Sequence, residues 1–151
     1  MQTDASPLVS VLTPVYNGEP FLRECIESVL SQSYDNWEYI ILNNASTDCS
    51  LEVANKYARR EKRLRVYSND SLLPIIENHN NAFRTINPRS KYCKVVSADD
   101  VILPDCLMRM VALAEAYPQV GVVGSYQLCG ANGPGADGPN RGAMRAFRTK
   151  L

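Results

Sequence analysis

The feature that most constrains the fold is a regular alternation of short apolar runs with segments of helical periodicity. Five runs rich in β-branched residues have the length of buried strands, and they cover residues 8–13, 37–42, 64–67, 92–96 and 120–126. Apolar residues at helical spacing lie between them, in residues 20–30, 51–58, 75–86 and 104–114. Strands that alternate with helices through short loops predict an α/β, Rossmann-like domain: a mostly parallel sheet with helices on both faces.

The bulk properties agree with a single globular domain. The chain has 151 residues, and 45% of them are hydrophobic, which is enough for a buried core. Sixteen basic and sixteen acidic residues cancel, so the net charge gives no reason to expect nucleic acid as a partner. Five widely spaced cysteines and the lack of a leader or of a long apolar run predict reduced thiols and a cytoplasmic location. Peripheral membrane association and a partner chain stay open.

Composition changes along the chain divide it into three parts. We expect an N-terminal extension over residues 1–7, a folded domain over residues 8–129 and an irregular, basic tail over residues 130–151. The tail holds five of the eight glycines and two prolines, and it carries a net charge of +3 from Arg141, Arg145, Arg148 and Lys150 against Asp137.

Two adjacent acidic residues follow the fourth predicted strand, in the segment Ser97-Ala98-Asp99-Asp100. Carboxylates at the end of a buried strand suit a divalent cation, because Mg²⁺ and Mn²⁺ prefer oxygen ligands. The alternative is a turn followed by an N-terminal cap, because Pro104 and a predicted helix come soon after.

Polar loops follow three of the predicted strands, at residues 14–19, 43–48 and 97–100. The carboxyl ends of parallel strands meet at one edge of a sheet, where ligands bind, so we expect these loops to form one crevice. Tyr16 can stack on a nucleobase there, or it can simply cover the end of the sheet. Asn44 can bind the edge of a base, although asparagine is also a common turn residue.

Two common phosphate-binding loops are absent from the sequence. No Gly-x-Gly-x-x-Gly follows the first predicted strand, and no Gly-Lys-Ser/Thr occurs anywhere. This argues against a dinucleotide dehydrogenase and a P-loop enzyme. Charge on a bound phosphate would have to be met by a metal at the acidic pair, with help from backbone amides or a basic side chain.

Four ordered motifs resemble the family 2 glycosyltransferases. They are the segments Val9–Asn17, Ile26–Tyr34, Asn43–Asp48 and Ser97–Asp100, and the resemblance spans about residues 8 to 129. It implies a GT-A fold, a nucleotide-sugar donor with a UDP-sugar favoured, a Mn²⁺ or Mg²⁺ cofactor and inversion at the anomeric carbon. It also implies a saccharide or lipid-linked acceptor and a role in the biosynthesis of a cell-envelope polysaccharide.

The resemblance also implies roles for residues on the first two loops. Thr13, Pro14 and Tyr16 would hold the base and ribose of the donor, with Glu19 close by. Asn44 stands where the family usually has an aspartate that accepts a hydrogen bond from the base. An asparagine oxygen can still accept that bond, but without charge.

On the third loop, Asp99 matches the last aspartate of the family's Asp-x-Asp motif, which contacts the metal and the diphosphate. Ser97 replaces the first aspartate, and Ser97 and Ala98 are expected beside the donor. A serine hydroxyl can contact a ribose but adds no negative charge for a metal. Asp100 is either a second metal ligand or a residue that anchors the loop and caps the following helix.

The segment Glu77–Phe83 resembles the family's helix beside the donor phosphates, where Asn78 would face the crevice. His79 is expected to be a packed or surface side chain rather than a catalyst. No residue stands in a context typical of the general base that activates the acceptor. We therefore expect a truncated, donor-binding half of an enzyme.

Two rivals remain. The first is a nucleotide-binding module, or an inactive glycosyltransferase fragment, that has lost catalysis and serves a partner chain. The second is a receiver-like or flavodoxin-like signalling domain, which uses the same alternation of strands and helices. The second is disfavoured because a receiver has its acidic pair directly after an early strand, where this chain has Thr13 and Pro14.

Overall fold

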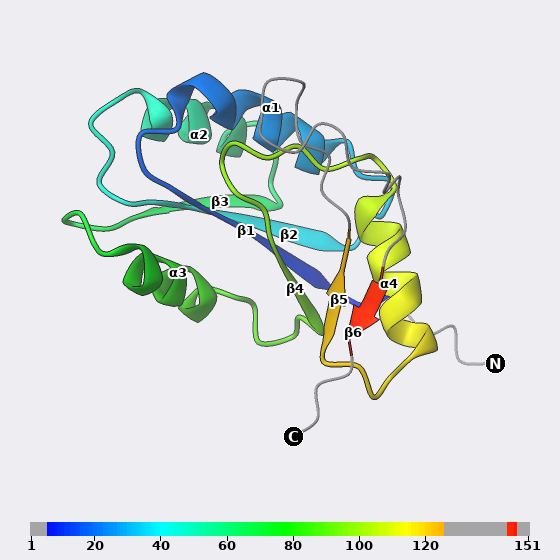
Figure 1. The fold of residues 1–151 in the computed structure, drawn as a ribbon. Coiled ribbons are helices and arrows are strands. Elements are labelled where there is room, and N and C mark those ends of the chain that lie inside the picture. The colour runs from blue at the N-terminus through cyan, green and yellow to red at the C-terminus, as the bar shows by residue number, and fades with distance from the viewer. Residues whose placement is uncertain (1–5, 126–144, 148–151) are drawn as a thin grey trace, which may run out of the picture. The chain divides into compact units, whose positions relative to one another are not determined.

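The structure, a computed structural model, describes residues 6–125 and 145–147. Within these residues the elements are β1 Val9–Val15, α1 Glu19–Leu30, β2 Trp37–Asn43, α2 Ser50–Ala58, β3 Leu64–Ser68, α3 Ile75–Arg84, β4 Tyr92–Val95, α4 Cys106–Ala116, β5 Val122–Gly124 and β6 Arg145–Phe147 (Figure 1). The chain divides into two compact units, Met1–Asp105 and Cys106–Leu151.

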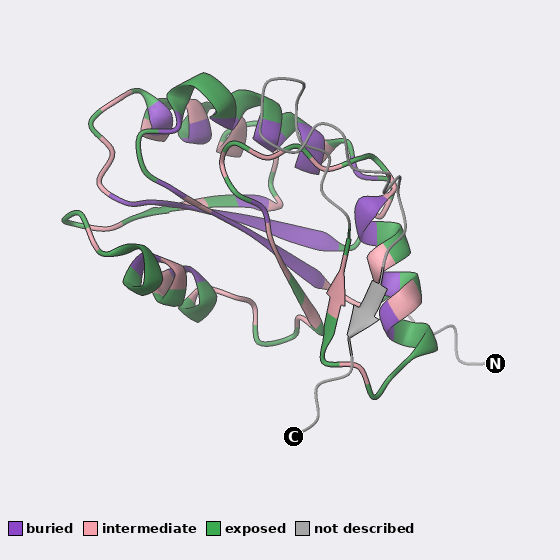
Figure 2. Ribbon diagram, viewed as in Figure 1, coloured by how far each residue is buried: buried purple, intermediate pink, exposed green. Residues whose placement is uncertain are grey.

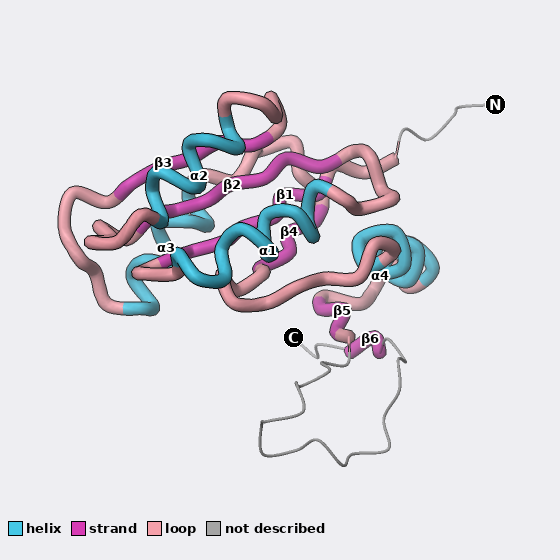
Figure 3. The backbone as a smooth tube through the Cα atoms, turned by 90° about the horizontal axis from the view of Figure 1, so that it is seen from above, coloured by secondary structure: helices cyan, strands magenta, loops and turns pink. Residues whose placement is uncertain are grey.

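The first unit is built on a four-stranded parallel sheet in the order β3-β2-β1-β4, which the view from above in Figure 3 displays strand by strand. Val9 of β1 is in register with Trp37 of β2 on one side and with Tyr92 of β4 on the other. The chain thus runs outward from β1 to β3 and then returns to the opposite side of β1. This reversal of strand order confirms the predicted α/β architecture and creates a switch point between β1 and β4.

Helices cover both faces of this sheet. Helices α1 and α2 lie on one face and α3 lies on the other (Figure 1). Strand β2 is buried along its whole length and β1 almost so, as the purple strands in Figure 2 show, which explains their continuous apolar sequences. Because side chains alternate along a strand, Leu12, Ile40 and Leu42 share one face, where they pack against Ala82 of α3.

Helix α1 begins where the sequence predicts. Pro20 lies in its first turn, and Gly18 O accepts hydrogen bonds from Phe21 N at 3.0 Å and from Leu22 N at 2.9 Å. One side of the helix is buried, through Leu22, Cys25, Ile26, Ser28 and Val29. Burial of this side holds α1, which begins at Glu19, shortly after the end of β1 at Val15.

A buried carboxylate joins the strands at the amino-terminal end of the sheet. Glu38 Oε1 accepts hydrogen bonds from Ser10 Oγ at 2.6 Å and from Asn87 N at 2.8 Å, and its other oxygen pairs with Arg65. Ser10 Oγ also lies 2.6 Å from Ser90 Oγ. These hydrogen bonds link the connection between α3 and β4 to β1 and β2, at the end of the strands opposite the polar loops.

The second unit differs from the sequence prediction. The fifth strand is β5, which has three residues and pairs antiparallel with β6 in a separate two-stranded sheet, so the prediction that it spans residues 120–126 of the parallel sheet is wrong. Strand β6 lies within the predicted irregular tail, and the rest of the tail is outside the described residues. No helix in the described part of the chain is long and apolar enough to cross a bilayer.

Candidate nucleotide-sugar site

An open cavity of about 330 Å³ lies at the carboxyl ends of β1 and β4, at the switch point of the sheet. Its lining residues come from the end of β1 and the loop that follows it, the start of α1, helix α3 and the loop after β4. They are Pro14, Val15, Tyr16, Asn17, Gly18, Phe21, His79, Ser97, Ala98 and Asp99. Two of the three loops that were expected to meet therefore do line one crevice.

The loop after β2 lies outside the cavity and supports the loop after β1. Asn17 N donates to Ser46 Oγ at 3.0 Å, and Asn17 Oδ1 accepts from Thr47 N at 2.8 Å. Gly18 N donates to Ser50 Oγ at 2.9 Å, at the start of α2. These bonds hold Asn17 at a φ of 49°, a left-handed conformation that asparagine tolerates better than most residues. The shape of the cavity wall thus depends on both loops.

Glu19 was expected beside the donor, but its side chain contacts the loop after β2. Its Oε2 accepts a hydrogen bond from Cys49 N at 3.1 Å, and Glu19 N donates to Asp48 Oδ2 at 3.0 Å. Asp48 Oδ1 also accepts from Ser50 N, the first residue of α2, at 3.0 Å, although the N-cap residue of this helix is Cys49. Desolvation raises the pKa of Asp48, but the hydrogen bonds from Ser50 and from backbone amides outweigh it and bring the pKa below its ordinary value.

Gly18 lies where the loops after β1 and β4 approach each other. A Cβ atom at this position would lie 2.7 Å from Val15 Cγ2 and 3.3 Å from Ala98 Cβ. Val15 is almost completely buried and its branched side chain has little freedom to move away. The close approach therefore requires glycine here.

Thr13 lies beneath the cavity and does not line it. Its side chain is fully buried, and its hydroxyl donates to Val96 O at 2.9 Å and so accepts from the Tyr39 hydroxyl, also at 2.9 Å. Cys25 Sγ donates to Ser97 O at 3.3 Å. Burial raises the pKa of both Tyr39 and Cys25, which keeps these groups neutral. Thr13 thus positions the start of the third loop instead of contacting a ligand with its side chain.

The acidic segment forms a turn in which its two carboxylates have different surroundings. Asp100 N donates to Ser97 O at 3.0 Å, and this bond closes the turn. Ser97 and Asp99 are exposed and line the cavity together with Ala98, whereas Asp100 is half-buried and does not line it. Asp99 is therefore the carboxylate that a ligand in the cavity would meet.

Asn44 is buried, and its carboxamide binds the loop between β3 and α3. Its Nδ2 donates to Leu73 O at 2.9 Å, and its Oδ1 accepts from Leu73 N at 3.0 Å and from Asn69 Nδ2 at 2.9 Å. The side chain does not line the cavity, and only 3% of the residue is exposed. The oxygen that was expected to accept a bond from a base already has two donors in this structure.

Asn69 was not predicted, and it connects this loop to α3. Its Nδ2 donates to Asn78 Oδ1 at 2.8 Å as well as to Asn44 Oδ1, and its Oδ1 accepts from Asn81 Nδ2 at 3.3 Å. Asn78 is buried by these contacts and does not line the cavity. The asparagines of three segments thus form one amide cluster beside the site.

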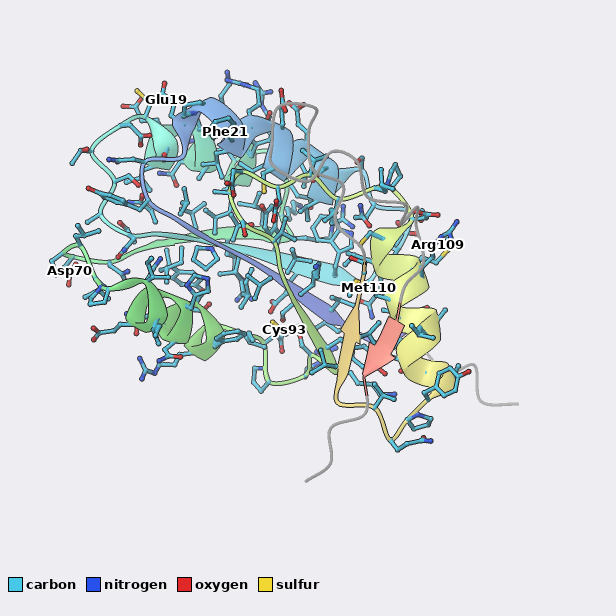
Figure 4. All side chains as sticks on the ribbon, in the orientation of Figure 1. Glu19, Phe21, Asp70, Cys93, Arg109 and Met110 are labelled. Carbon is cyan, nitrogen blue, oxygen red and sulfur yellow. The ribbon has the colours of Figure 1, made fainter. Side chains whose placement is uncertain are left out.

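Two rings that line the cavity were not predicted as site residues. Phe21 extends from the first turn of α1 (Figure 4) and is 56% exposed; the sequence indicated only that it lies in the helical run of residues 20–30. His79 lines the cavity from α3, where a packed or surface position was expected. Pro14, Tyr16, Ser97, Ala98 and Asp99 are the predicted donor-binding residues that do line it.

Comparison with known proteins identifies the family. The model of glycosyl transferase family 2 matches residues 10–148. This chain belongs to glycosyl transferase family 2. The match includes every loop of the cavity, and it extends beyond the domain boundary that we expected at residue 129.

Relatives and solved structures agree with this assignment. The putative glycosyltransferase EpsE of Bacillus subtilis is 35% identical over 126 residues, which are 83% of this chain and 45% of EpsE. TarS residues 1–349 of S. aureus, solved with UDP-GlcNAc, superpose with a TM-score of 0.72 at 26% identity, over 84% of this chain and 36% of TarS. The mannosyltransferase PcManGT of Pyrobaculum calidifontis, solved with GDP-Man and Mn²⁺, has a TM-score of 0.72 at 24% identity, over 81% and 36%.

These comparisons confirm the GT-A fold that the motifs implied. The chain spans less than half of the length of EpsE and of two further curated relatives. The aligned part of the family 2 fold contains the switch-point cavity, with Tyr16 on one loop and Asp99 on the other.

Proposed function

We propose that this chain is the donor-binding part of a glycosyltransferase that transfers a sugar from a nucleotide diphosphate to an acceptor. The observation that carries the proposal is the cavity at the switch point, in which an exposed aromatic ring and an exposed carboxylate come from adjacent strands. Membership of family 2 supports it, as does the solved complex of TarS with UDP-GlcNAc. We favour a UDP-sugar as the donor because TarS was solved with UDP-GlcNAc.

In this proposal the two loops bind different parts of the donor. Tyr16 is 47% exposed, and its ring is available to stack on the nucleobase. Pro14 and Ser97 line the same cavity, and in this proposal they contact the base or the ribose. Thr13 and Asn44 act from behind the cavity wall, through the contacts that position the loops.

Asp99 is the residue that would hold Mn²⁺ or Mg²⁺. No group of three or more histidine, cysteine or acidic side chains within the described residues is arranged to bind a metal. The single exposed carboxylate of Asp99 suits a Mg²⁺-type site, because such ions are commonly held by one or two carboxylates together with substrate phosphates. A bound divalent cation supplies positive charge that stabilises the departing diphosphate. Asp100 lies outside the cavity and would act on the loop.

The reaction also requires activation of the acceptor, and the described cavity leaves this role unassigned. Asp99 is the only acidic residue among its lining residues, and the proposal gives that carboxylate to the metal. Inverting transfer to a saccharide or lipid-linked acceptor, and a role in cell-envelope polysaccharide biosynthesis, stay predictions from the family resemblance. The cytoplasmic location also stays a prediction.

One observation favours a second candidate, a nucleotide-binding module without transferase activity. Ser97 stands in place of an acidic residue beside Asp99, so the site has less negative charge with which to hold a metal. Such a module would bind the nucleotide but leave the sugar attached. Release of UDP from UDP-GlcNAc, measured with water and with a panel of saccharide acceptors, separates the two candidates.

Calorimetric titration of UDP and GDP, with Mn²⁺ and with EDTA, tests donor binding itself. We expect one nucleotide to bind in a metal-dependent manner, and Asp99→Asn to remove the effect of the metal. Asp35→Asn is the matched control. Asp35 is an exposed aspartate in the loop before β2, at the amino-terminal end of the strands and away from the cavity. Failure of both nucleotides to bind, or equal metal dependence in Asp99→Asn, would contradict the proposal.

A further inference from the structure

Helix α3 presents one side chain to the cavity, and that side chain is His79. Its neighbour Asn78 is buried, with Oδ1 bonded to Asn69 Nδ2 at 2.8 Å. Asn80 is exposed and does not line the cavity. Any direct contact between α3 and a ligand in this cavity therefore involves His79.

The surroundings of the imidazole ring decide which nitrogen atom can meet a ligand. His79 Nδ1 lies 2.8 Å from Ile75 O, one turn earlier in the same helix. A carbonyl oxygen only accepts hydrogen bonds, so Nδ1 carries the hydrogen and is the donor of this bond. Nε2 is the atom that remains for a ligand, and in the imidazolium form it donates as well.

The charge of the cavity determines what His79 can contribute. A nucleoside diphosphate is an anion, and among the described lining residues the only carboxylate is that of Asp99. No lysine or arginine is among these residues, so His79 is the one lining side chain in this part of the structure that can carry positive charge. Hydrogen bonds from a charged donor to a phosphate are about twice as strong as neutral ones.

We infer that His79, in its imidazolium form, donates a hydrogen bond from Nε2 to the diphosphate of a nucleotide bound in this cavity. The inference rests on the proposed function, and it assigns a role to a residue that we expected from the sequence to be a packed or surface side chain. Nε2 and the metal at Asp99 would then neutralise the same group. The bond between Nδ1 and Ile75 O restricts rotation of the ring and leaves Nε2 as the nitrogen available to a ligand.

Two amide substitutions separate this role from a structural one. In His79→Gln the side-chain nitrogen takes the place of Nε2, whereas in His79→Asn it takes the place of Nδ1. If Nε2 contacts the diphosphate, His79→Gln retains part of the affinity for UDP, and His79→Asn and His79→Ala both lose about tenfold. If the bond to Ile75 O were the important one, His79→Asn would be the better substitute.

The experiment titrates UDP and uridine, in the presence of Mn²⁺, into the full chain and its variants. We expect His79→Ala to weaken UDP binding about tenfold and to change uridine binding by less than about twofold, since uridine lacks phosphate. Asn80→Ala is the matched control, and UDP affinity should be unchanged in it. GDP and guanosine replace UDP and uridine if the wild-type chain prefers guanine nucleotides.

Several results would overturn the inference. Equal losses for UDP and uridine would place His79 at the base or ribose, and a better rescue by His79→Asn would make the residue structural. A similar loss of affinity for Mn²⁺ alone would make Nε2 a metal ligand. If the wild-type chain bound neither UDP nor GDP, the proposed function would fail together with the inference, whereas normal binding by His79→Ala would refute the inference alone.

Discussion

Replacement of Asn44 with alanine tests whether this residue holds the loop between β3 and α3 or contacts the nucleobase. In the structure its carboxamide makes three hydrogen bonds, two with Leu73 and one with Asn69, at 2.9–3.0 Å. Alanine removes all three and leaves two backbone groups of Leu73 without this partner. If the loop-holding role is correct, the main effect is on stability.

The size of the effect follows from the number and burial of these bonds. A hydrogen bond contributes about 0.5–1.5 kcal/mol net, so three of them give about 3 kcal/mol. Leu73 is half-buried and water can reach part of its backbone, so we expect a loss of about 2–3 kcal/mol in the free energy of unfolding. For a chain of this size that corresponds to a decrease in Tm of roughly 5–10 °C.

Urea unfolding followed by circular dichroism measures the loss, and a double-mutant cycle locates it. Asn80→Ala, in an exposed position of α3, should change stability by less than about 0.5 kcal/mol. In the cycle, Asn44→Ala and Asn69→Ala should couple by about 1 kcal/mol, because they share a hydrogen bond. Additive effects of the two substitutions, or a loss in Asn44→Ala no larger than in Asn80→Ala, would refute the reasoning.

Three further predictions concern the loops and a partly buried ion pair. Gly18→Ala should lower stability by about 1–3 kcal/mol in the same assay, because the new Cβ would lie 2.7 Å from the Val15 side chain; an unchanged midpoint would disprove the tight fit. Ala45→Gly should raise stability by about 0.5 kcal/mol, because Ala45 has a φ of 54°, and a loss would show that this conformation is not strained. Hydrogen bonds from Arg63 lower the pKa of Glu61 from 4.5 to about 2, so its contribution is complete above pH 4.5 and disappears as the pH falls toward 2. Glu61→Gln should lower the free energy of unfolding by less than about 1 kcal/mol at pH 7, and this difference from the wild type should vanish near pH 2. An equal difference at both pH values would contradict the pairing of Glu61 with Arg63.

The sequence predicts the first unit well because its strands are short, apolar and bounded by polar loops. Strand β2, predicted over residues 37–42, extends over Trp37–Asn43, and α1 begins beside Pro20 as expected. The fifth strand was predicted poorly, because an apolar run of a few residues does not specify its partner or direction. Its partner β6 lies more than twenty residues away, in a segment with no apolar periodicity.

The candidate site was predicted as a set of loops more accurately than as a set of side chains. The rule for parallel sheets places Tyr16 and Asp99 at one edge, and both line the cavity. Position along the chain cannot distinguish a side chain that faces the cavity from one that lies beneath it. Thr13 and Asn44 lie beneath the cavity. Their polar atoms form hydrogen bonds with Val96 and Leu73, which are distant from them in the sequence.

The spectral broadening caused by Mn²⁺ tests the central claim most directly, because it locates the bound ion within the structure. We expect Mn²⁺ added with UDP to broaden the amide resonances of residues 16–18 and 97–99, which border the cavity. The resonances of Glu38 and Asn87, at the amino-terminal end of the sheet, should remain sharp. Broadening centred on Glu38, or the same broadening in Asp99→Asn, would contradict a nucleotide and metal site at the switch point.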